Sequence, residues 1–341
     1  MSSDRPVSSA QSGSLFGDDP PAPAGVQAAT PEPAHVELAR RLPAGLRLGT
    51  SSWNFPGWAG LVWDRLYDSK RLSREGLGAY AQHPLLGAVG LDRSFYQPLT
   101  VAQYAGYADQ VPESFRFVVK APARVTDALI RESGGKGRRA NPHFLNADSA
   151  WREFVAPASR GLGQRLGALV FQISPLPNRW LDHMDRLIAQ LHDLLQSAAA
   201  ARSDSPESVV AVEVRNPEWL TPAFVDALKA AGATYCLGLH PKMPPITAQL
   251  PILRALWPGP LVCRWNLNLK HGAYGYEKAR EDYAPFDKLV DPDPDTRSTL
   301  ARVIAGTVGA GQSAYVTVNN KAEGSSPRSV IALAEAVQAA G

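Results

Sequence analysis

Short apolar runs alternate with stretches of helix length from residue 46 onward. Each run is rich in aliphatic and β-branched residues, which is the pattern of a buried strand. The expected strands lie at 46–50, 86–91, 115–120, 168–173, 209–214, 234–239, 261–265 and 314–319.

Apolar residues at helical spacing fill the stretches between several of these runs. The clearest case is 179–197, where Leu187, Leu191 and Leu195 recur at every fourth position. Thr221 followed by Pro222 is typical of an N-cap and a first helical residue. The expected helices lie at 100–110, 149–160, 179–197, 221–231, 298–309 and 327–340.

Eight strand–helix units predict an α/β fold, a closed (β/α)8 barrel of the TIM type. The alternative is a doubly wound open sheet, which would normally carry a phosphate-binding loop. The Gly-x-Gly at Gly161 and Gly163 lacks the third glycine of that loop, and it precedes an expected strand instead of following one. The closed barrel is therefore the preferred interpretation.

The first 44 residues differ in composition from the rest of the chain. They contain seven prolines and eight alanines and show no periodic apolar pattern, so they bury too little surface to offset the entropy of ordering. We expect residues 1–44 to be a disordered N-terminal tail and residues 45–341 to form a single barrel domain.

Composition and charge narrow the class of protein. Hydrophobic residues make up 45% of the 341, yet no run approaches the roughly 18 apolar residues of a spanning helix, and no apolar signal segment begins the chain. We therefore expect a cytoplasmic protein without membrane contact. Cys236 and Cys263 are expected to be reduced core thiols. The net charge of +3 is too small for a general nucleic-acid coat, although basic residues concentrate in 120–139.

Inward residues at the C-terminal strand ends of a barrel line its mouth, where active sites form. In the run 209–214 the valines at 210, 212 and 214 face the helices, so Glu213 and Arg215 share the inward face. One interpretation is an internal ion pair that holds the mouth together. The other, which we prefer, is a functional site.

The expected mouth is rich in positive charge. Its four basic residues are Lys120, Arg215, Arg264 and Lys321. They would repel one another, and the carboxylates of Glu213 and Asp92 compensate only part of this charge. An anionic ligand would complete the balance, with phosphate as the first candidate, because Arg offers a planar fork and Lys a point charge. The alternative is that these side chains extend into water.

These arguments define the candidate site. The expected catalytic residues are Glu213 as general base or acid, with Arg215 and Lys120 as oxyanion clamps. The expected substrate-binding residues are Arg264, Gln172, Asn319, Asn320, Trp53, Tyr96, Asp92 and Lys321. Trp53 follows the first strand, and a core position for its ring is an equal alternative.

The chain resembles the YecE-like family, also called domain of unknown function 72. The segments that carry the resemblance are Gly49-Thr-Ser-Ser-Trp53, Ser94-Phe-Tyr96, Phe117-Val-Val-Lys120, Leu166-Gly-Ala-Leu-Val-Phe-Gln172, Ala211-Val-Glu213-Val-Arg215 with Trp219, and Tyr315-Val-Thr-Val-Asn-Asn320. The resemblance implies a TIM-type barrel of unestablished activity, sometimes likened to nucleic-acid-processing barrels. It also matches Lys120, Gln172, Glu213, Arg215, Arg264 and Asn319.

The chain departs from the family pattern at two places. Where the family reads roughly Val-Glu-Ile-Asn-Ser-Thr before Phe-Tyr, this chain has Gly90 at the position of the glutamate. The family's His-Gly after the seventh strand is replaced by Trp265 and Asn266. These departures favour a divergent or ligand-binding subgroup.

Several functions remain open. The first is an enzyme acting on a phosphorylated or other anionic substrate, of a hydrolase or phosphoryl-transfer type. The second is a nucleic-acid-binding or processing barrel whose 124–139 loop contacts phosphates. Glycoside hydrolysis by Asp92 and Glu213 is disfavoured because the direction of Asp92 is open, and binding without turnover is a fourth option. No cofactor is evident, a divalent metal is left open, and the oligomeric state is undetermined.

Overall fold

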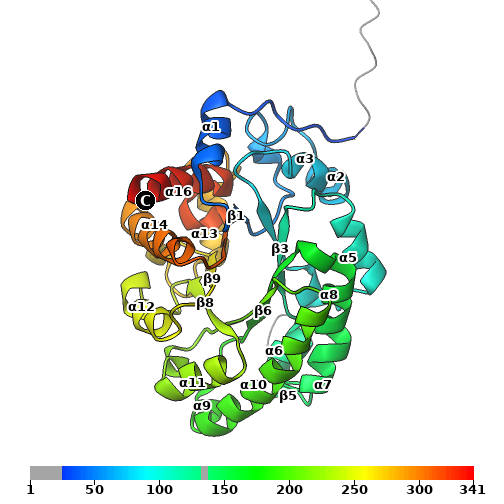
Figure 1. Cartoon of the computed structure of the whole chain (residues 1–341), viewed down its shortest axis with the longest axis vertical. Helices are drawn as coiled ribbons and strands as arrows, with labels where there is room; N and C mark the ends of the chain where they lie inside the picture. Colours follow the sequence, from blue (N-terminus) through cyan, green and yellow to red (C-terminus); the bar gives the residue numbers. More distant parts are fainter. Residues whose placement is uncertain (1–24, 132–136) are drawn as a thin grey trace, which may run out of the picture.

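The computed structural model describes residues 25–131 and 137–341. Eight parallel strands close into a barrel in the order β1-β10-β9-β8-β7-β6-β3-β2, and helices surround them, which confirms the expected architecture (Figure 1). The barrel strands are β1 (Leu46–Thr50), β2 (Ala88–Leu91), β3 (Arg116–Lys120), β6 (Leu166–Gln172), β7 (Val209–Glu213), β8 (Thr234–Leu239), β9 (Leu261–Trp265) and β10 (Ala314–Val318). Each overlaps one expected run.

The outer helices follow the strands around the barrel. They are α5 (Val101–Ala108), α7 (Ala147–Ala150), α8 (Ala156–Leu162), α10 (Met184–Ala198), α11 (Pro222–Ala230), α12 (Ile246–Ala255), α14 (Pro294–Gly309) and α16 (Ser326–Ala340). Shorter helices are α2 (Ser69–Glu75), α3 (Leu77–Tyr80), α4 (Arg93–Tyr96), α6 (Ala123–Thr126), α9 (Asn178–Leu181), α13 (Tyr276–Tyr283) and α15 (Asn320–Glu323).

The six expected helices are present, but two of the expected stretches are divided. The stretch 149–160 contains a π-helical turn at Trp151–Val155 that joins α7 to α8, and the stretch 179–197 is divided between α9 and α10. The sequence did not predict α12, which contains Pro251 in its interior. Thr221 caps α11 as expected, since its side-chain oxygen accepts a hydrogen bond from the Phe224 N–H at 3.3 Å.

Two sets of buried apolar side chains form on the two faces of the barrel sheet. The valines at 210, 212 and 214 belong to the large cluster between strands and helices. A smaller cluster fills the barrel interior and consists of Val118, Ala168, Val170, Val209, Ala211, Cys236, Val262 and Tyr315. This packing confirms the alternation expected for 209–214 and places the charged residues at the end of β7 above the apolar interior.

The N-terminal segment differs from the expectation. Within the predicted tail 1–44, residues 25–44 are part of the fold and include helix α1 (Pro33–Arg41). Leu38 and Val26 are buried in the main core, so these two side chains supply the contacts that the composition argument overlooked. Residues 1–24 lie outside the described residues.

A two-stranded antiparallel sheet follows α6, formed by β4 (Leu129–Arg131) and β5 (Gly137–Ala140). It belongs to the connection between β3 and β6, which the sequence presented as one basic loop. No helix in the described part of the chain is long and apolar enough to cross a membrane.

Candidate functional site

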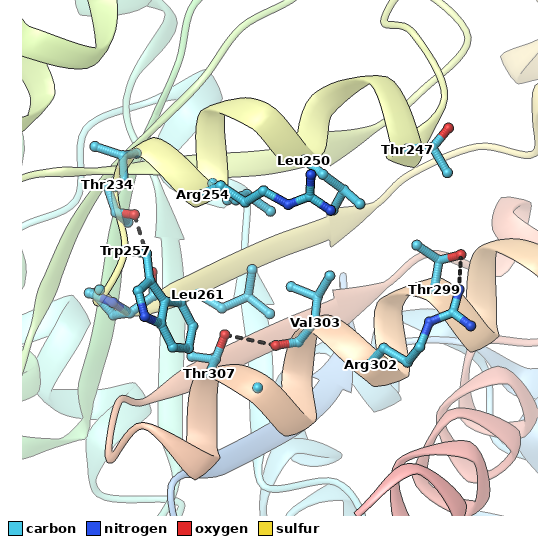
Figure 2. A pocket seen from close by; sticks show the side chains of 15 residues that line it. Thr234, Thr247, Leu250, Arg254, Trp257, Leu261, Thr299, Arg302, Val303 and Thr307 are labelled. Carbon is cyan, nitrogen blue, oxygen red and sulfur yellow. Dashed lines mark hydrogen bonds between the residues drawn. The ribbon is translucent and has the colours of Figure 1, made fainter.

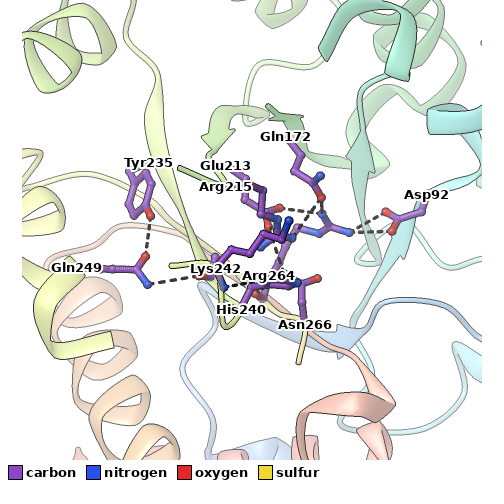
Figure 3. Close-up of polar contacts among 11 residues, drawn as sticks. Asp92, Gln172, Glu213, Arg215, Tyr235, His240, Lys242, Gln249, Arg264 and Asn266 are labelled. Carbon is purple, nitrogen blue, oxygen red and sulfur yellow. Dashed lines mark hydrogen bonds and ion pairs between the residues drawn. The ribbon is translucent and has the colours of Figure 1, made fainter. Parts of the chain in front are cut away.

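Glu213 lies at the centre of the polar cluster at the barrel mouth (Figure 3). Its side chain is completely buried at the end of β7. Arg215 Nη2 lies 2.5 Å from Oε1, Arg264 Nη1 lies 2.8 Å from Oε2, and Asn266 Nδ2 donates to Oε1 at 3.2 Å. The expectation that Glu213 and Arg215 face one another inside the barrel is confirmed.

Gly238 on β8 makes room for this carboxylate. A Cβ at Gly238 would lie 3.1 Å from Glu213 Cγ and 3.2 Å from Oε1, closer than ordinary van der Waals contact. The absence of a side chain at this position therefore allows Glu213 to reach both arginines.

The charge state of Glu213 follows from its neighbours. Burial alone would raise the pKa of this carboxyl, but the charges of Arg215 and Arg264 outweigh burial and hold the pKa below its ordinary value. Glu213 is therefore ionised at neutral pH. It can hold cations in place, but it has no proton to donate.

Arg264 on β9 connects three parts of the mouth. Its Nη2 lies 2.9 and 2.8 Å from the two carboxylate oxygens of Asp92, and its Nη1 donates to Gln172 Oε1 at 3.2 Å as well as to Glu213. The pKa of Arg264 is raised because the charges of Asp92 and Glu213 outweigh its burial. The side chain of Asp92, whose direction the sequence left open, points into the mouth and is about a third exposed, at 37%.

Arg215 is less completely satisfied than Arg264. Its Nη2 contacts Glu213 and donates to Gln172 Oε1 at 3.3 Å. Its Nη1 is buried and has no hydrogen-bond partner among the described residues. A buried guanidinium nitrogen without an acceptor is costly, so this atom is suited to receive an oxyanion.

Lys120 ends β3 and is 9% exposed. Its Nζ lies 3.5 Å from the centroid of the Phe95 ring, and no carboxylate of the described residues lies within 4 Å of it. Burial is the main cause that lowers the pKa of this amine to about 8. The charges of Asp92 and Glu213 act against the shift, while those of Arg264 and Arg215 support it.

The positive charge expected at the mouth is only partly compensated. Lys120, Arg215 and Arg264 act electrostatically on one another, with Asp92 and Glu213 as the carboxylates in the same group. Three cations against two carboxylates leave one positive charge in excess. A small anion would balance this charge.

Two predicted substrate-binding residues lie away from Glu213 and have structural contacts. Trp53 is in the core, where its Nε1 donates to the Leu72 carbonyl at 3.1 Å. Asn320 accepts from Trp58 Nε1 at 3.3 Å and from the Ser326 N–H at 2.7 Å. The structure therefore favours the core interpretation of Trp53. Asn320 joins the segment that follows β10 to the segment that follows β1.

The other predicted residues lie at the rim. Asn319 caps α15 by accepting from the Lys321 N–H at 3.0 Å. The Lys321 Nζ lies 4.1 Å from the centroid of the Tyr276 ring, and burial lowers the pKa of this amine to about 8. Tyr96 is 86% exposed on α4. These side chains do not contact Glu213.

His240 is a mouth residue that the sequence arguments missed. It directly follows β8, and Figure 3 places it beside Arg264 and Asn266. Its Nδ1 accepts from the Lys242 N–H at 3.0 Å, so the neutral ring carries its proton on Nε2. Burial, followed by the charge of Arg215, lowers the pKa of His240 to about 4. The strand-end rule that identified Lys120 applies equally to His240, which follows β8.

The position of the missing family glutamate is sterically closed. A Cβ at Gly90 would lie 2.9 Å from the Ser51 carbonyl oxygen and 3.1 Å from the Ser51 Cα. Asp92 follows two residues later on the same inward face and brings its carboxylate to Arg264. The chain thus keeps a carboxylate at this end of β2 despite Gly90.

A cavity of about 600 Å³ lies elsewhere, between α12 and α14 (Figure 2). It reaches Thr234 and Leu261, the first residues of β8 and β9, so it is at the end of the barrel opposite the mouth. Among its described lining residues there is no carboxylate, histidine or lysine. Within the described ranges, no group of three or more His, Cys, Asp or Glu side chains could hold a metal ion.

Comparison with known sequences gives one family. A family model described as "Protein of unknown function DUF72" matches residues 47–341. UPF0759 protein YunF of Bacillus subtilis (strain 168) is 27% identical over 164 residues, which is 48% of this chain and 50% of that protein. The matched region thus spans about half the length of this curated relative.

Comparison with solved structures gives the same fold. A DUF72 family protein from Enterococcus faecalis V583 superimposes with a TM-score of 0.55 at 17% identity, covering 86% of this chain and 95% of that one. A DUF72 family protein from Thermotoga maritima MSB8 gives a TM-score of 0.50 at 18% identity, covering 85% and 98%.

Proposed function

Because the chain belongs to the DUF72 family, whose function is unknown, the site itself has to indicate the activity. We propose that the barrel mouth is the active site of an enzyme that binds a small anionic substrate between Arg215 and Lys120. A carboxylate or phosphate group of the substrate would compensate the excess positive charge of the mouth.

The observation that carries this proposal is the buried Nη1 of Arg215, which has no acceptor within the described structure. Arg264, at the same mouth, has carboxylate oxygens on both terminal nitrogens. The two arginines therefore differ in what they can still bind, and Arg215 is the one with free capacity. Lys120, which has no carboxylate of the described residues within 4 Å, adds a second point of positive charge.

The remaining polar residues have positioning roles in this proposal. Glu213 is ionised and holds both arginines, while Gln172 accepts from each of them. We therefore revise the expected role of Glu213 from general acid or base to positioning residue. His240 and Lys120 are two basic groups at the mouth whose pKa is lowered, so they are neutral more readily than ordinary histidine and lysine side chains.

Thermal unfolding in the presence of inorganic phosphate tests the proposal. A ligand that binds the folded protein raises the melting temperature. We expect phosphate to stabilise the wild type, and Arg215→Ala to abolish this stabilisation relative to its own ligand-free form. Arg254→Ala removes an exposed arginine outside the mouth, on α12, and should keep the response. An equal loss in both variants would contradict the assignment.

Nucleic-acid binding is the second candidate, favoured by exposed aromatic rings at the rim. Tyr96 is 86% exposed and Tyr276 is 42% exposed, and such rings can stack on bases. The slope of binding against salt concentration separates the candidates. A short single-stranded oligonucleotide that neutralises several phosphates gives a steep slope, whereas a small anion gives a shallow one.

A further inference from the structure

Lys120 differs from the arginines of the mouth in its surroundings. Arg215 and Arg264 both contact the Glu213 carboxylate, and Arg264 contacts Asp92 as well. The Lys120 Nζ instead faces the Phe95 ring at 3.5 Å, and none of the described carboxylates lies within ion-pair distance of it. A lysine that only supplied charge to a structural network would be expected to have such a partner.

We propose that Lys120 is a nucleophile that condenses with the carbonyl group of an anionic aldehyde or ketone to form a Schiff base. The inference rests on the proposed function, because the carboxylate or phosphate group of the same molecule is the one held by Arg215. It changes the role of Lys120 from an oxyanion clamp to the group that bonds the substrate, and it narrows the substrate class to carbonyl compounds.

The environment provides the neutral amine that this reaction needs. Lysine is activated as a nucleophile by desolvation in an apolar pocket and by neighbouring cations. Lys120 has both, since it is buried and lies within the field of Arg264 and Arg215, while the face of the Phe95 ring favours the ammonium form. Asp92 and Glu213 also face it and oppose the effect, yet the pKa remains at about 8. At pH 7 the neutral fraction of Lys120 is therefore much larger than that of an ordinary lysine.

The condensation is balanced without a redox partner. The ammonium first releases a proton to solvent, and the neutral Nζ attacks the carbonyl carbon, forming a C–N bond. A proton moves from the nitrogen to the former carbonyl oxygen and gives a neutral carbinolamine. The hydroxyl then takes up a proton from solvent, the C–O bond breaks to release water, and the nitrogen electron pair forms the C=N bond. The product is a protonated imine. In sum, ammonium and carbonyl give iminium and water, with no change in oxidation state.

Lys321 is the natural comparison within the same chain. The pKa of its amine is also lowered to about 8, but its Nζ lies between the rings of Tyr276 and Phe286, at 4.1 and 5.8 Å from their centroids. Arg264 and Arg215, the arginines at the centre of the mouth, are not among the charges that act on it. An anionic carbonyl compound held by Arg215 is therefore expected to react with Lys120 and not with Lys321.

Reductive trapping tests the inference on the full chain. Glyoxylate, pyruvate and glyceraldehyde 3-phosphate are each incubated with the protein and cyanoborohydride at pH 7, and peptide masses locate the reduced adduct. We expect at least one probe to label Lys120 at least about tenfold faster than the exposed Lys229 of α11. Lys120→Arg should lose the label, and Lys229→Arg should keep it. Acetone, which lacks an anionic group, should label Lys120 more slowly.

The outcomes separate this inference from the proposed function. Phosphate should stabilise the wild type and Lys229→Arg equally, because Lys229 lies on α11 outside the mouth. If phosphate stabilises the protein and no probe labels Lys120 faster than Lys229, the nucleophile assignment is wrong while anion binding stands. If phosphate stabilises neither the wild type nor Lys229→Arg, the proposed anion binding at the mouth is wrong. Labelling concentrated on Lys321 would also overturn the inference.

Discussion

Asp92 and Arg264 are paired through both oxygens of the carboxylate, although 172 positions separate them along the chain. Asp92 follows β2 and Arg264 lies on β9, with β1 and β10 between these strands in the barrel order. Because Arg264 also contacts Glu213 on β7, a single guanidinium links both sides of the mouth. The cluster is therefore a support for the mouth as well as part of its surface.

The two carboxylates of this cluster should differ in their effect on stability. Glu213→Gln leaves two buried arginines without their shared counter-charge, so we expect a loss of about 3 kcal/mol in the free energy of unfolding. Asp92→Asn should cost about 1 kcal/mol, because Asp92 is partly exposed and solvent screens its charge. Urea unfolding of both variants provides the comparison. Equal losses in the two variants would show that burial does not determine how much each carboxylate contributes to stability.

Acid should weaken the fold through Glu213. Its folded-state pKa lies below its unfolded value, so the ion pairs contribute their full stability above the unfolded pKa of about 4.3 and lose it as pH falls through the folded pKa. The wild type should therefore have a higher free energy of unfolding than Glu213→Gln at pH 6, and this difference should become smaller as the pH is lowered to 3. A difference independent of pH would mean that Glu213 is not ionised in the native protein.

Base should have the opposite effect through Lys120. Its pKa is lowered to about 8 in the folded state, so between pH 8 and about 10.4 the unfolded chain binds more protons than the folded one. The stability of wild type relative to Lys120→Met should rise across this window. Lys229→Met, which changes an exposed lysine of α11, should show no such trend.

Gly238→Ala should disturb the mouth without replacing a charged residue. The new methyl group would press on Glu213 Cγ and Oε1, so we expect a destabilisation of about 1–2 kcal/mol and a weaker response to phosphate. Gly106→Ala is the control, because a Cβ there meets nothing within 4 Å and α5 should gain about 0.5–1 kcal/mol. Normal phosphate stabilisation in Gly238→Ala would contradict the role given to Glu213.

Trp53 offers a test of a residue that the sequence left between two interpretations. Trp53→Phe removes the hydrogen bond to the Leu72 carbonyl, so we expect a loss of about 1 kcal/mol in stability. The rise in melting temperature caused by phosphate should stay unchanged, since the ring is in the core. If Trp53→Phe instead lost the phosphate response while its stability stayed unchanged, Trp53 would be a binding residue and the core interpretation would be wrong.

The barrel could be predicted from the sequence because every strand has a local signature. The runs at 46–50, 234–239 and 261–265 coincide with β1, β8 and β9, since apolar composition and strand length agree there. The period of two also placed Glu213 and Arg215 correctly, because the alternation of a strand fixes which side chains share a face.

The partners of these residues could not be predicted in the same way. The distribution of two carboxylates over two arginines depends on contacts between β2, β7 and β9, which no local pattern contains. Composition also misjudged residues 25–44, because Val26 and Leu38 are isolated apolar positions whose burial depends on a surface made elsewhere in the chain.

The hydrogen bond between Trp58 Nε1 and Asn320 Oδ1 lies at the seam where the first strand meets the last. β1 pairs with β10 along its full length, and the other seven strands of the barrel precede β10 in the chain. A chain that lacked β10 would leave one edge of β1 and one edge of β9 without a partner. Such edges are templates for pairing with another chain, so a product truncated before β10 would be prone to aggregation.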